Sequence, residues 1–272
     1  MFYLGIDVGS LTAEAILLEG TRVVASATIA ALANPLDSAQ EVRGRVLGER
    51  GLGPVDVRYT ISTGYGREAI QTEGIAQQNL SEISCHGYGA WCLQPRVRTV
   101  IDIGGQDAKA IRVDERGGLD RFAMNDKCAA GTGHFLEHMS RTLEVDLDEL
   151  GPLALSARRP VRMTSRCTIF VETEVLHFLQ RGRTRANIAA GVADAMAERV
   201  SALARRVHPV AEMTMTGGVA KNVAVRREVE KRLGLPLAHL RFDPQLVGAY
   251  GAARLAARKG VDRLAARQEV DR

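Results

Sequence analysis

The chain has 272 residues, of which 46% are hydrophobic and 25% charged, with a formal net charge of +4. This composition allows a full hydrophobic core in one large or two small domains, and it excludes a disordered chain. Aromatic residues make up only 4% and the arginines are scattered, so the basic stripe of a nucleic-acid-binding protein is missing. No stretch approaches the roughly 20 apolar residues of a membrane span. We therefore expect a cytoplasmic protein that contacts neither nucleic acid nor membrane.

The first distinctive pattern lies at the N-terminus. Residues 3–16 read YLGIDVGSLTAEAI, which is an apolar run, Asp7, a turn containing Gly9, and a second apolar run. This pattern predicts a β-hairpin whose turn can present backbone N–H groups to an anion. A single copy is also compatible with an ordinary hairpin that exposes an aspartate.

The next elements complete a first half of the chain. The patterns predict a strand over 22–30, a helix over 37–49, a strand over 57–62 and a helix over 79–92. The glycine-flanked turn over 63–67 either lines a binding cleft or simply connects strand to helix. Cys85 and Cys92 are seven residues apart, which is ordinary spacing for core residues on one helix face.

The N-terminal pattern then recurs. Residues 100–111 read VIDIGGQDAKAI, so that Asp102 repeats Asp7 and Gly104 repeats Gly9 at a constant offset of 102 − 7 = 95 residues. Two copies in register predict two similar halves, each offering a carboxylate and an N–H-lined turn to a cleft between them. Such a cleft suits the phosphates of a nucleotide and their Mg²⁺ ion. A further strand is expected over 119–124.

Two cysteines follow the second hairpin. Cys128 lies in the sequence NDKCAAGTG, ahead of a predicted helix with Phe135, Leu136, Met139 and Leu143 on one face. Cys167 lies 39 residues later, ahead of a second apolar-periodic helix that Ser165 or Thr168 can cap. A helix N-terminus favours a thiolate. The plainer alternative is two buried cysteines near helix starts.

The number of cysteines limits the kind of metal site. Cys128 and Cys167 are too far apart for a zinc-ribbon pair, and an iron-sulfur cluster normally takes four thiolates. If a two-fold axis relates two chains, this pair from each chain supplies four ligands to one 4Fe-4S cluster. The competing arrangement is a cluster within one chain that adds Cys85 and Cys92.

The last third of the chain predicts one more nucleotide-facing element. A strand over 212–216 ends in Gly217-Gly218 and leads into a helix over 219–233, which is a turn that can approach an adenosine or can simply connect two elements. We also expect a strand over 160–164, a helix over 188–207 and a small-residue helix start over 248–257, which can also approach the nucleotide. Alternating charges predict a solvated tail over 260–272.

Together these motifs resemble a known family. The two hairpins, with MTGGVAKN at 215–222, resemble the nucleotide site of the acetate and sugar kinase, heat-shock chaperone and actin superfamily. More narrowly, GIDVGS, STGYGR, DIGGQD, NDKCAAGTG and the Cys167 stretch resemble the activator ATPases of 2-hydroxyacyl-CoA dehydratases and the ATPase subunits of benzoyl-CoA reductases. The resemblance runs from about Leu4 to about Ala257.

The resemblance implies a fold and a division of the chain. The fold class is α/β, with duplicated ribonuclease-H-like (actin-like ATPase) domains and the nucleotide in the interdomain cleft. The first lobe is expected over 1–95, with the helix over 248–259 returning to it. The second lobe, over 96–247, carries the cluster cysteines.

The resemblance also implies roles for individual residues. Asp7 and Asp102 position Mg²⁺ and the attacking water, together with Gln106. The groups that hold ATP or ADP are expected to be Gly9, Ser10, Leu11, Thr12, Gly104, Gly105, Gln106, Asp107, Gly131, Gly133, Gly217, Gly218 and Asn222. Cys128 and Cys167 are the ligands of one 4Fe-4S cluster per homodimer, or per heterodimer with a related ATPase subunit.

The implied activity is ATP-driven electron transfer. An electron from ferredoxin or flavodoxin would pass through the cluster to a dehydratase or reductase that acts on a CoA thioester. One alternative is a small-molecule kinase of the sugar or pantothenate type, for which Asp107 is the candidate base. Another is an actin-like or chaperone-like protein without a redox centre.

Overall fold

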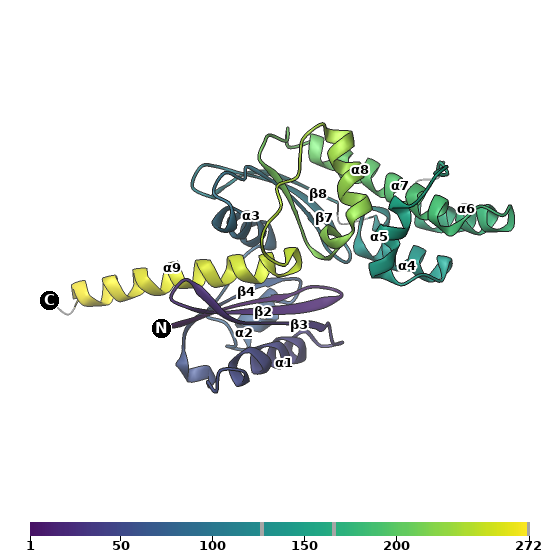
Figure 1. Ribbon diagram of the computed structural model, residues 1–272. Coiled ribbons are helices and arrows are strands. Elements are labelled where there is room, and N and C mark those ends of the chain that lie inside the picture. The colour runs from purple at the N-terminus through teal and green to yellow at the C-terminus, as the bar shows by residue number, and fades with distance from the viewer. Residues whose placement is uncertain (126–127, 165–166, 271–272) are drawn as a thin grey trace. The chain divides into compact units, whose positions relative to one another are not determined.

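The computed structural model describes residues 1–125, 128–164 and 167–270 (Figure 1). Asp126 and Lys127 of the NDKCAAGTG loop, the candidate cap Ser165, and residues 271–272 of the predicted tail lie outside the described residues. The chain forms two compact units. Unit 1 comprises 1–95, 116–119 and 241–272, and unit 2 comprises 96–115 and 120–240.

Unit 1 is built on a five-stranded sheet in the order β3-β2-β1-β4-β5. The strands are β1 (Phe2–Val8), β2 (Thr12–Glu19), β3 (Arg22–Ala30), β4 (Val57–Gly64) and β5 (Gln78–Asn79). The helices are α1 (Pro35–Gly48), α2 (Arg67–Thr72), α3 (Glu82–Leu93) and α9 (Val247–Val270), with short 3₁₀ turns η1 (Pro54–Asp56) and η4 (Pro244–Leu246). The antiparallel β1–β2 and β2–β3 pairs and the parallel β1–β4 pair confirm the first hairpin and the strand over 22–30.

Both faces of this sheet are covered by helices (Figure 1). Alternate residues of β1, including Leu4 and Ile6, pack with Val42 and Val46 of α1, while Tyr3 packs on the opposite face with α9. The contact with α9 is close at Gly5, where an added Cβ would lie 2.0 Å from the carbonyl oxygen of Ala249. Burial on both faces explains why β1 and β2 are almost continuously apolar.

Unit 2 is built on a four-stranded sheet in the order β8-β7-β6-β9. The strands are β6 (Thr99–Ile103), β7 (Ala108–Val113), β8 (Leu119–Asn125) and β9 (Met213–Thr216). The helices are α4 (Gly133–Leu143), α5 (Leu147–Leu155), α6 (Thr168–Gln180), α7 (Arg185–Arg205) and α8 (Val223–Leu233), with 3₁₀ turns η2 (Ala129–Gly131) and η3 (Gly218–Lys221). One apolar core joins strands and helices, and Phe135, Met139, Val192 and Met196 contribute to it.

The two sheets repeat one arrangement. In each, an antiparallel hairpin has its first strand paired in parallel with a later strand, and a Thr-Gly pair stands at the end of that later strand, Thr63-Gly64 within β4 and Thr216-Gly217 at the end of β9. Thr63 of β4 lies opposite Asp7, and Thr216 of β9 lies opposite Asp102. The duplication read from the two hairpins therefore extends to the neighbouring parallel strand.

Several local predictions were wrong. Residues 160–164 form no strand, because the backbone N–H of Val161 bonds the carbonyl of Asn187 instead of a sheet neighbour. The helix expected over 219–233 is interrupted, because Asn222 ends η3 and caps α8. Helices α2 and α5 and strand β5 were not predicted. In α6, Val171 and Val175 are buried, whereas Ile169 and Leu176 are exposed.

The described helices include none that combines the length and the apolar character of a membrane span.

Candidate functional site

The turn of the first hairpin is closed by one backbone bond. The N–H of Gly9 donates to the carbonyl of Thr12 at 2.9 Å, which leaves Ser10 and Leu11 as a two-residue loop. The amides of these two residues therefore lie outside the strand ladder, at the end of β1 where Asp7 is placed. This is the local geometry that the sequence predicts for an anion-binding turn.

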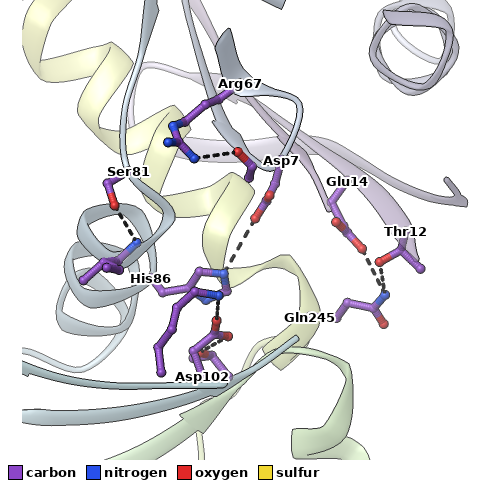
Figure 2. A network of polar contacts seen from close by, with 12 residues as sticks. Asp7, Thr12, Glu14, Arg67, Ser81, His86, Asp102 and Gln245 are labelled. Atoms are coloured by element: carbon purple, nitrogen blue, oxygen red, sulfur yellow. Dashed lines mark hydrogen bonds and ion pairs between the residues drawn. The ribbon is translucent and has the colours of Figure 1, made fainter. Parts of the chain in front are cut away.

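Asp7 is buried at 7% exposure and surrounded by close backbone (Figure 2). A Cβ added to Gly64, which has φ +80°, would lie 2.3 Å from Asp7 Oδ1, and one added to Gly248 would lie 2.0 Å from Oδ2. His86 Nε2, on α3, is 3.6 Å from the same Oδ2. The end of β4, the start of α9 and the middle of α3 thus fix this carboxylate, and glycine is required where the chain approaches it.

Glu14 lies opposite Asp7 in the β1–β2 register and is 4% exposed. Burial, reinforced by the Asp7 carboxylate, raises the pKa of Glu14 to about 8. The amide of Gln245 donates to Glu14 Oε1 at 2.9 Å and to the Thr12 hydroxyl at 3.1 Å (Figure 2). Gln245 is held by η4, where its own N–H donates to the Asp243 side chain. The hairpin therefore carries a neutral Glu14 beside Asp7 at neutral pH.

The second hairpin has the same backbone but different side-chain chemistry. Gly104 N–H donates to the Asp107 carbonyl at 3.0 Å, which is the bond equivalent to Gly9–Thr12. Lys109, at the repeat position of Glu14, is 1% exposed and lies 3.3 Å from Asp102 Oδ2 and 2.6 Å from Asp107 Oδ1. A buried ammonium therefore compensates two carboxylates here, where the first hairpin relies on a protonated acid.

Asp102 is held on its other oxygen as well. The Thr216 hydroxyl donates to Asp102 Oδ1 at 2.9 Å. Gly217 has φ +82°, and a Cβ added there would lie 2.3 Å from the carbonyl oxygen of Ile103 and 3.0 Å from Asp102 Oδ1. Gly217 therefore corresponds to Gly64 of the first half.

The loop of the second hairpin is joined to the start of α4. The N–H groups of Gly133 and His134 donate to the carbonyls of Gly104 and Gly105 at 2.8 and 2.9 Å. Gln106 Nε2 lies 3.5 Å from His134 Nε2. Asp102, residues 104–107, Gly133 and Gly217 are thus brought together within unit 2.

The remaining nucleotide candidates have other contacts. Asn222 Oδ1 accepts bonds from the N–H groups of Ala224 and Val225, both at 3.1 Å, so this oxygen caps α8. Gly218 begins η3, directly after Gly217. Gly131 ends η2 and is buried beneath the side chain of Arg199.

Cys128 and Cys167 are both exposed, and each directly precedes a helical segment, a 3₁₀ turn for Cys128 and an α-helix for Cys167. Cys128 precedes the turn η2, so α4 begins only at Gly133, five residues later. Cys167 is the N-cap residue of α6, although its side chain makes no capping hydrogen bond. Their successors, Ala129 and Thr168, line one open hollow on unit 2. The plainer alternative of two buried cysteines is therefore wrong.

The other two cysteines belong to unit 1. Cys85 is fully buried in the core beside α9, and burial raises the pKa of its thiol to about 12. Burial also raises the pKa of Cys92, which is half-buried. Core packing, as predicted, accounts for Cys85, and its burial makes it a poor ligand.

Sequence reasoning missed several residues around the two aspartates. They are Glu14, His86, Lys109, Thr216 and Gln245. Glu14 and Lys109 could have been found, because they share the 95-residue offset of the two hairpins. His86 and Gln245 come from distant segments with no motif of their own.

Comparison with known proteins agrees with this architecture. The chain matches the BadF/BadG/BcrA/BcrD ATPase family over residues 4–256. It is 43% identical over 256 residues to the activator of lactoyl-CoA dehydratase of Anaerotignum propionicum, covering 94% of this chain and 97% of that protein. It is also 43% identical over 262 residues to the (R)-2-hydroxyglutaryl-CoA dehydratase activating ATPase of Acidaminococcus fermentans, covering 95% and 98%.

A solved structure extends the likeness to three dimensions. The activator of 2-hydroxyisocaproyl-CoA dehydratase from Clostridium difficile, with bound ADPNP, superposes with a TM-score of 0.91 at 37% identity and covers 97% of both chains. The predicted fold class, an α/β protein of the actin-like ATPase type, is confirmed. The chain therefore belongs to the BadF/BadG/BcrA/BcrD ATPase family.

Proposed function

We propose that the protein is an ATP-hydrolysing activator that delivers a low-potential electron to a dehydratase or reductase of CoA thioesters. The observation that carries the electron-transfer half is the pair of exposed cysteines, Cys128 and Cys167, whose successors Ala129 and Thr168 line one hollow of unit 2. The ATPase half is supported by the family and by the two hairpins with their buried aspartates.

The cysteines fit a cluster that is shared between two chains. A 4Fe-4S cluster normally takes four thiolates. Among the described residues, no group of three or more His, Cys, Asp or Glu side chains could hold a metal ion. Two cysteines from each of two chains would complete the set, and the bound group would supply one-electron chemistry at low potential.

The surface next to Cys167 suits contact with a second copy. Ile169 and Phe170, in the first turn of α6, are 69% and 63% exposed. Large apolar side chains at such exposure favour a protein contact over solvent. We therefore propose a homodimer whose two-fold axis passes beside the start of α6.

We assign the nucleotide to the two hairpins. Asp7 and Asp102 would orient Mg²⁺ and the attacking water, while the loop amides of residues 9–12 and 104–107 would hold phosphates. The loops carrying Gly131, Gly133, Gly217, Gly218 and Asn222 would complete the binding site for ATP or ADP. In the proposed reaction, ferredoxin or flavodoxin supplies the electron, and the CoA-thioester enzyme accepts it.

A line of contacts within unit 2 can couple these two activities. The hairpin loop bonds the start of α4 through Gly133 and His134. On the same helix, His138 Nε2 lies 2.9 Å from Glu172 Oε2, on α6. A movement of the loop with the γ-phosphate would therefore reach the helix that directly follows Cys167. ATP would shift the equilibrium between two arrangements of the loop and this helix, because it would bind one arrangement more tightly than the other.

The alternative of a small-molecule kinase is less well supported. Its candidate base, Asp107, is engaged by the buried ammonium of Lys109 at 2.6 Å. A kinase or an actin-like protein would also leave two exposed cysteines at helix starts without a purpose.

The test is electron delivery by matched cysteine variants. Anaerobically purified wild type, Cys128→Ser, Cys167→Ser and Cys92→Ser would be reduced and mixed with a 2-hydroxyacyl-CoA dehydratase component and ATP. We expect ATP-dependent reduction of the component by wild type and Cys92→Ser, and none by the other two variants, although all four hydrolyse ATP. Activation by Cys128→Ser or Cys167→Ser, or phosphoryl transfer to a sugar or to pantothenate, would contradict the proposal.

A further inference from the structure

The guanidinium group of Arg199 lies beside the sulfur of Cys128. Nη1 of Arg199, on α7, is 3.9 Å from Cys128 Sγ. The stem of Arg199 packs over Gly131, where an added Cβ would lie 3.6 Å from Arg199 Cβ. The carbonyl of Cys128 accepts a bond from Asn125 Nδ2 at 3.0 Å. The cysteine is thus fixed at its backbone and faces a fixed cation at its sulfur.

This cation has no compensating carboxylate in the part of the chain that the structure describes. Within those residues, the Arg199 side chain donates a hydrogen bond to Cys128 Sγ. Arg185 and Arg205, on the same helix, instead bond Glu144 Oε2 at 2.5 Å and the Arg232 carbonyl at 2.7 Å. Arg199 is partly exposed, and its bond to a neutral thiol is weak, because a thiol is a weak acceptor. The bond becomes stronger when that sulfur carries negative charge.

Cys167 is in a different electrostatic setting. It is the N-cap residue of the 13-residue helix α6, at the positive end of the helix dipole, and its side chain makes no capping hydrogen bond. Positive potential at Cys167 is therefore partial and comes from the backbone. At Cys128 it is a full charge on a side chain, which mutation can remove.

We propose that Arg199 is a positioning residue that raises the reduction potential of the cluster bound through Cys128. This inference rests on the proposed function, because it requires the shared cluster. A reduced cluster is more negative than an oxidised one, so a fixed cation and an N–H donor at a ligand sulfur stabilise the reduced form. In a two-fold dimer, both Cys128 ligands receive this contact.

The experiment measures the potential of the cluster, not the activity. Wild type, Arg199→Gln, Arg199→Met and Arg199→Lys would be purified without oxygen, assayed for iron, and titrated with Ti(III) citrate while EPR follows the reduced cluster. We expect Arg199→Gln and Arg199→Met to lower the midpoint potential by about 59 mV or more, a tenfold loss in the ratio of reduced to oxidised cluster at fixed poise. Arg199→Lys, which keeps the charge, should shift it by less than half as much.

The control removes an arginine that has no role in the site. Arg227 is exposed on α8, and Arg227→Gln changes the net charge of the protein equally. It should leave the potential within error of wild type. An equal shift in Arg227→Gln and Arg199→Gln would attribute the effect to overall charge and overturn the inference.

The remaining outcomes also decide the matter. Loaded Arg199→Gln with an unchanged potential would refute the role of Arg199 while leaving the proposed function intact. If Arg199→Gln and Arg199→Met lose iron and Arg199→Lys keeps it, the cation is needed to hold the cluster, which supports the inference in a stronger form. If all three variants lose iron, the role of Arg199 is packing, and the inference fails. Wild type without iron would refute the proposed function itself.

Discussion

Burying Glu14 should make unit 1 less stable as the pH rises. The side chain is 4% exposed, opposite Asp7, and its pKa is raised from 4.5 to about 8 by burial and by that neighbour. Between these two values the folded state holds a proton that the unfolded state has lost. The free energy of unfolding therefore falls across this window and levels off above the folded pKa.

Replacing Glu14 by glutamine should remove this dependence, because the amide mimics the protonated acid. From pH 5.5 to pH 8, the pKa difference predicts that wild type loses about 3 kcal/mol more than Glu14→Gln, at 1.36 kcal/mol per unit. Solvent screening reduces this little, since the group is almost fully buried. Glu41→Gln, which removes an exposed partner of Arg45, should keep the wild-type dependence.

The assay can isolate unit 1. The chain has one tryptophan, Trp91, and it belongs to this unit. Urea unfolding followed by its fluorescence, at several values between pH 5.5 and pH 8, gives the three free-energy curves. Parallel curves for wild type and Glu14→Gln would refute the reasoning, because Glu14 would then be ionised in the folded protein without cost.

Three further changes test the rest of the structure. Lys109→Met should destabilise unit 2 by about 3–5 kcal/mol, since it leaves the buried Asp102 and the partly exposed Asp107 without their cation, and adding Asp107→Asn should recover part of this in chemical denaturation. Gly248→Ala should abolish ATP hydrolysis and lower the free energy of unfolding by about 1–3 kcal/mol, because the added methyl group overpacks against Asp7. Gly44→Ala, in open space on α1, should instead raise the free energy of unfolding by about 0.5–1 kcal/mol. Thermal melts that rank these two variants alike would contradict the packing. Phe170→Asp should weaken the proposed dimer and lower iron content together, and sedimentation that shows an intact dimer would contradict the proposed interface.

The hairpins could be predicted because their signals are local. An apolar run, a glycine turn and a second apolar run within about 15 residues determine β1–β2 and β6–β7 almost alone. The helix over 133–143 was equally clear from the spacing of its buried residues. The strand expected over 160–164 failed because an apolar segment next to a helix can bond that helix instead of a sheet.

The surroundings of the aspartates could not be predicted, because they are tertiary. His86 and Gln245 reach their partners from segments far from the first hairpin in sequence. Position 14 and position 109 look alike in the repeat, yet one holds a carboxylic acid and the other a lysine. Only burial and the neighbouring carboxylates decide that the first is protonated and the second charged.

The central claim is that two chains share one cluster, and it is tested most directly by counting iron and acid-labile sulfide per chain in protein purified without oxygen. The account predicts about two irons per chain, as one 4Fe-4S cluster per dimer requires, with the count lost in Cys128→Ser and Cys167→Ser and retained in Cys92→Ser. About four irons per chain would instead place a cluster within each chain. An absence of iron from protein that still hydrolyses ATP would contradict the claim.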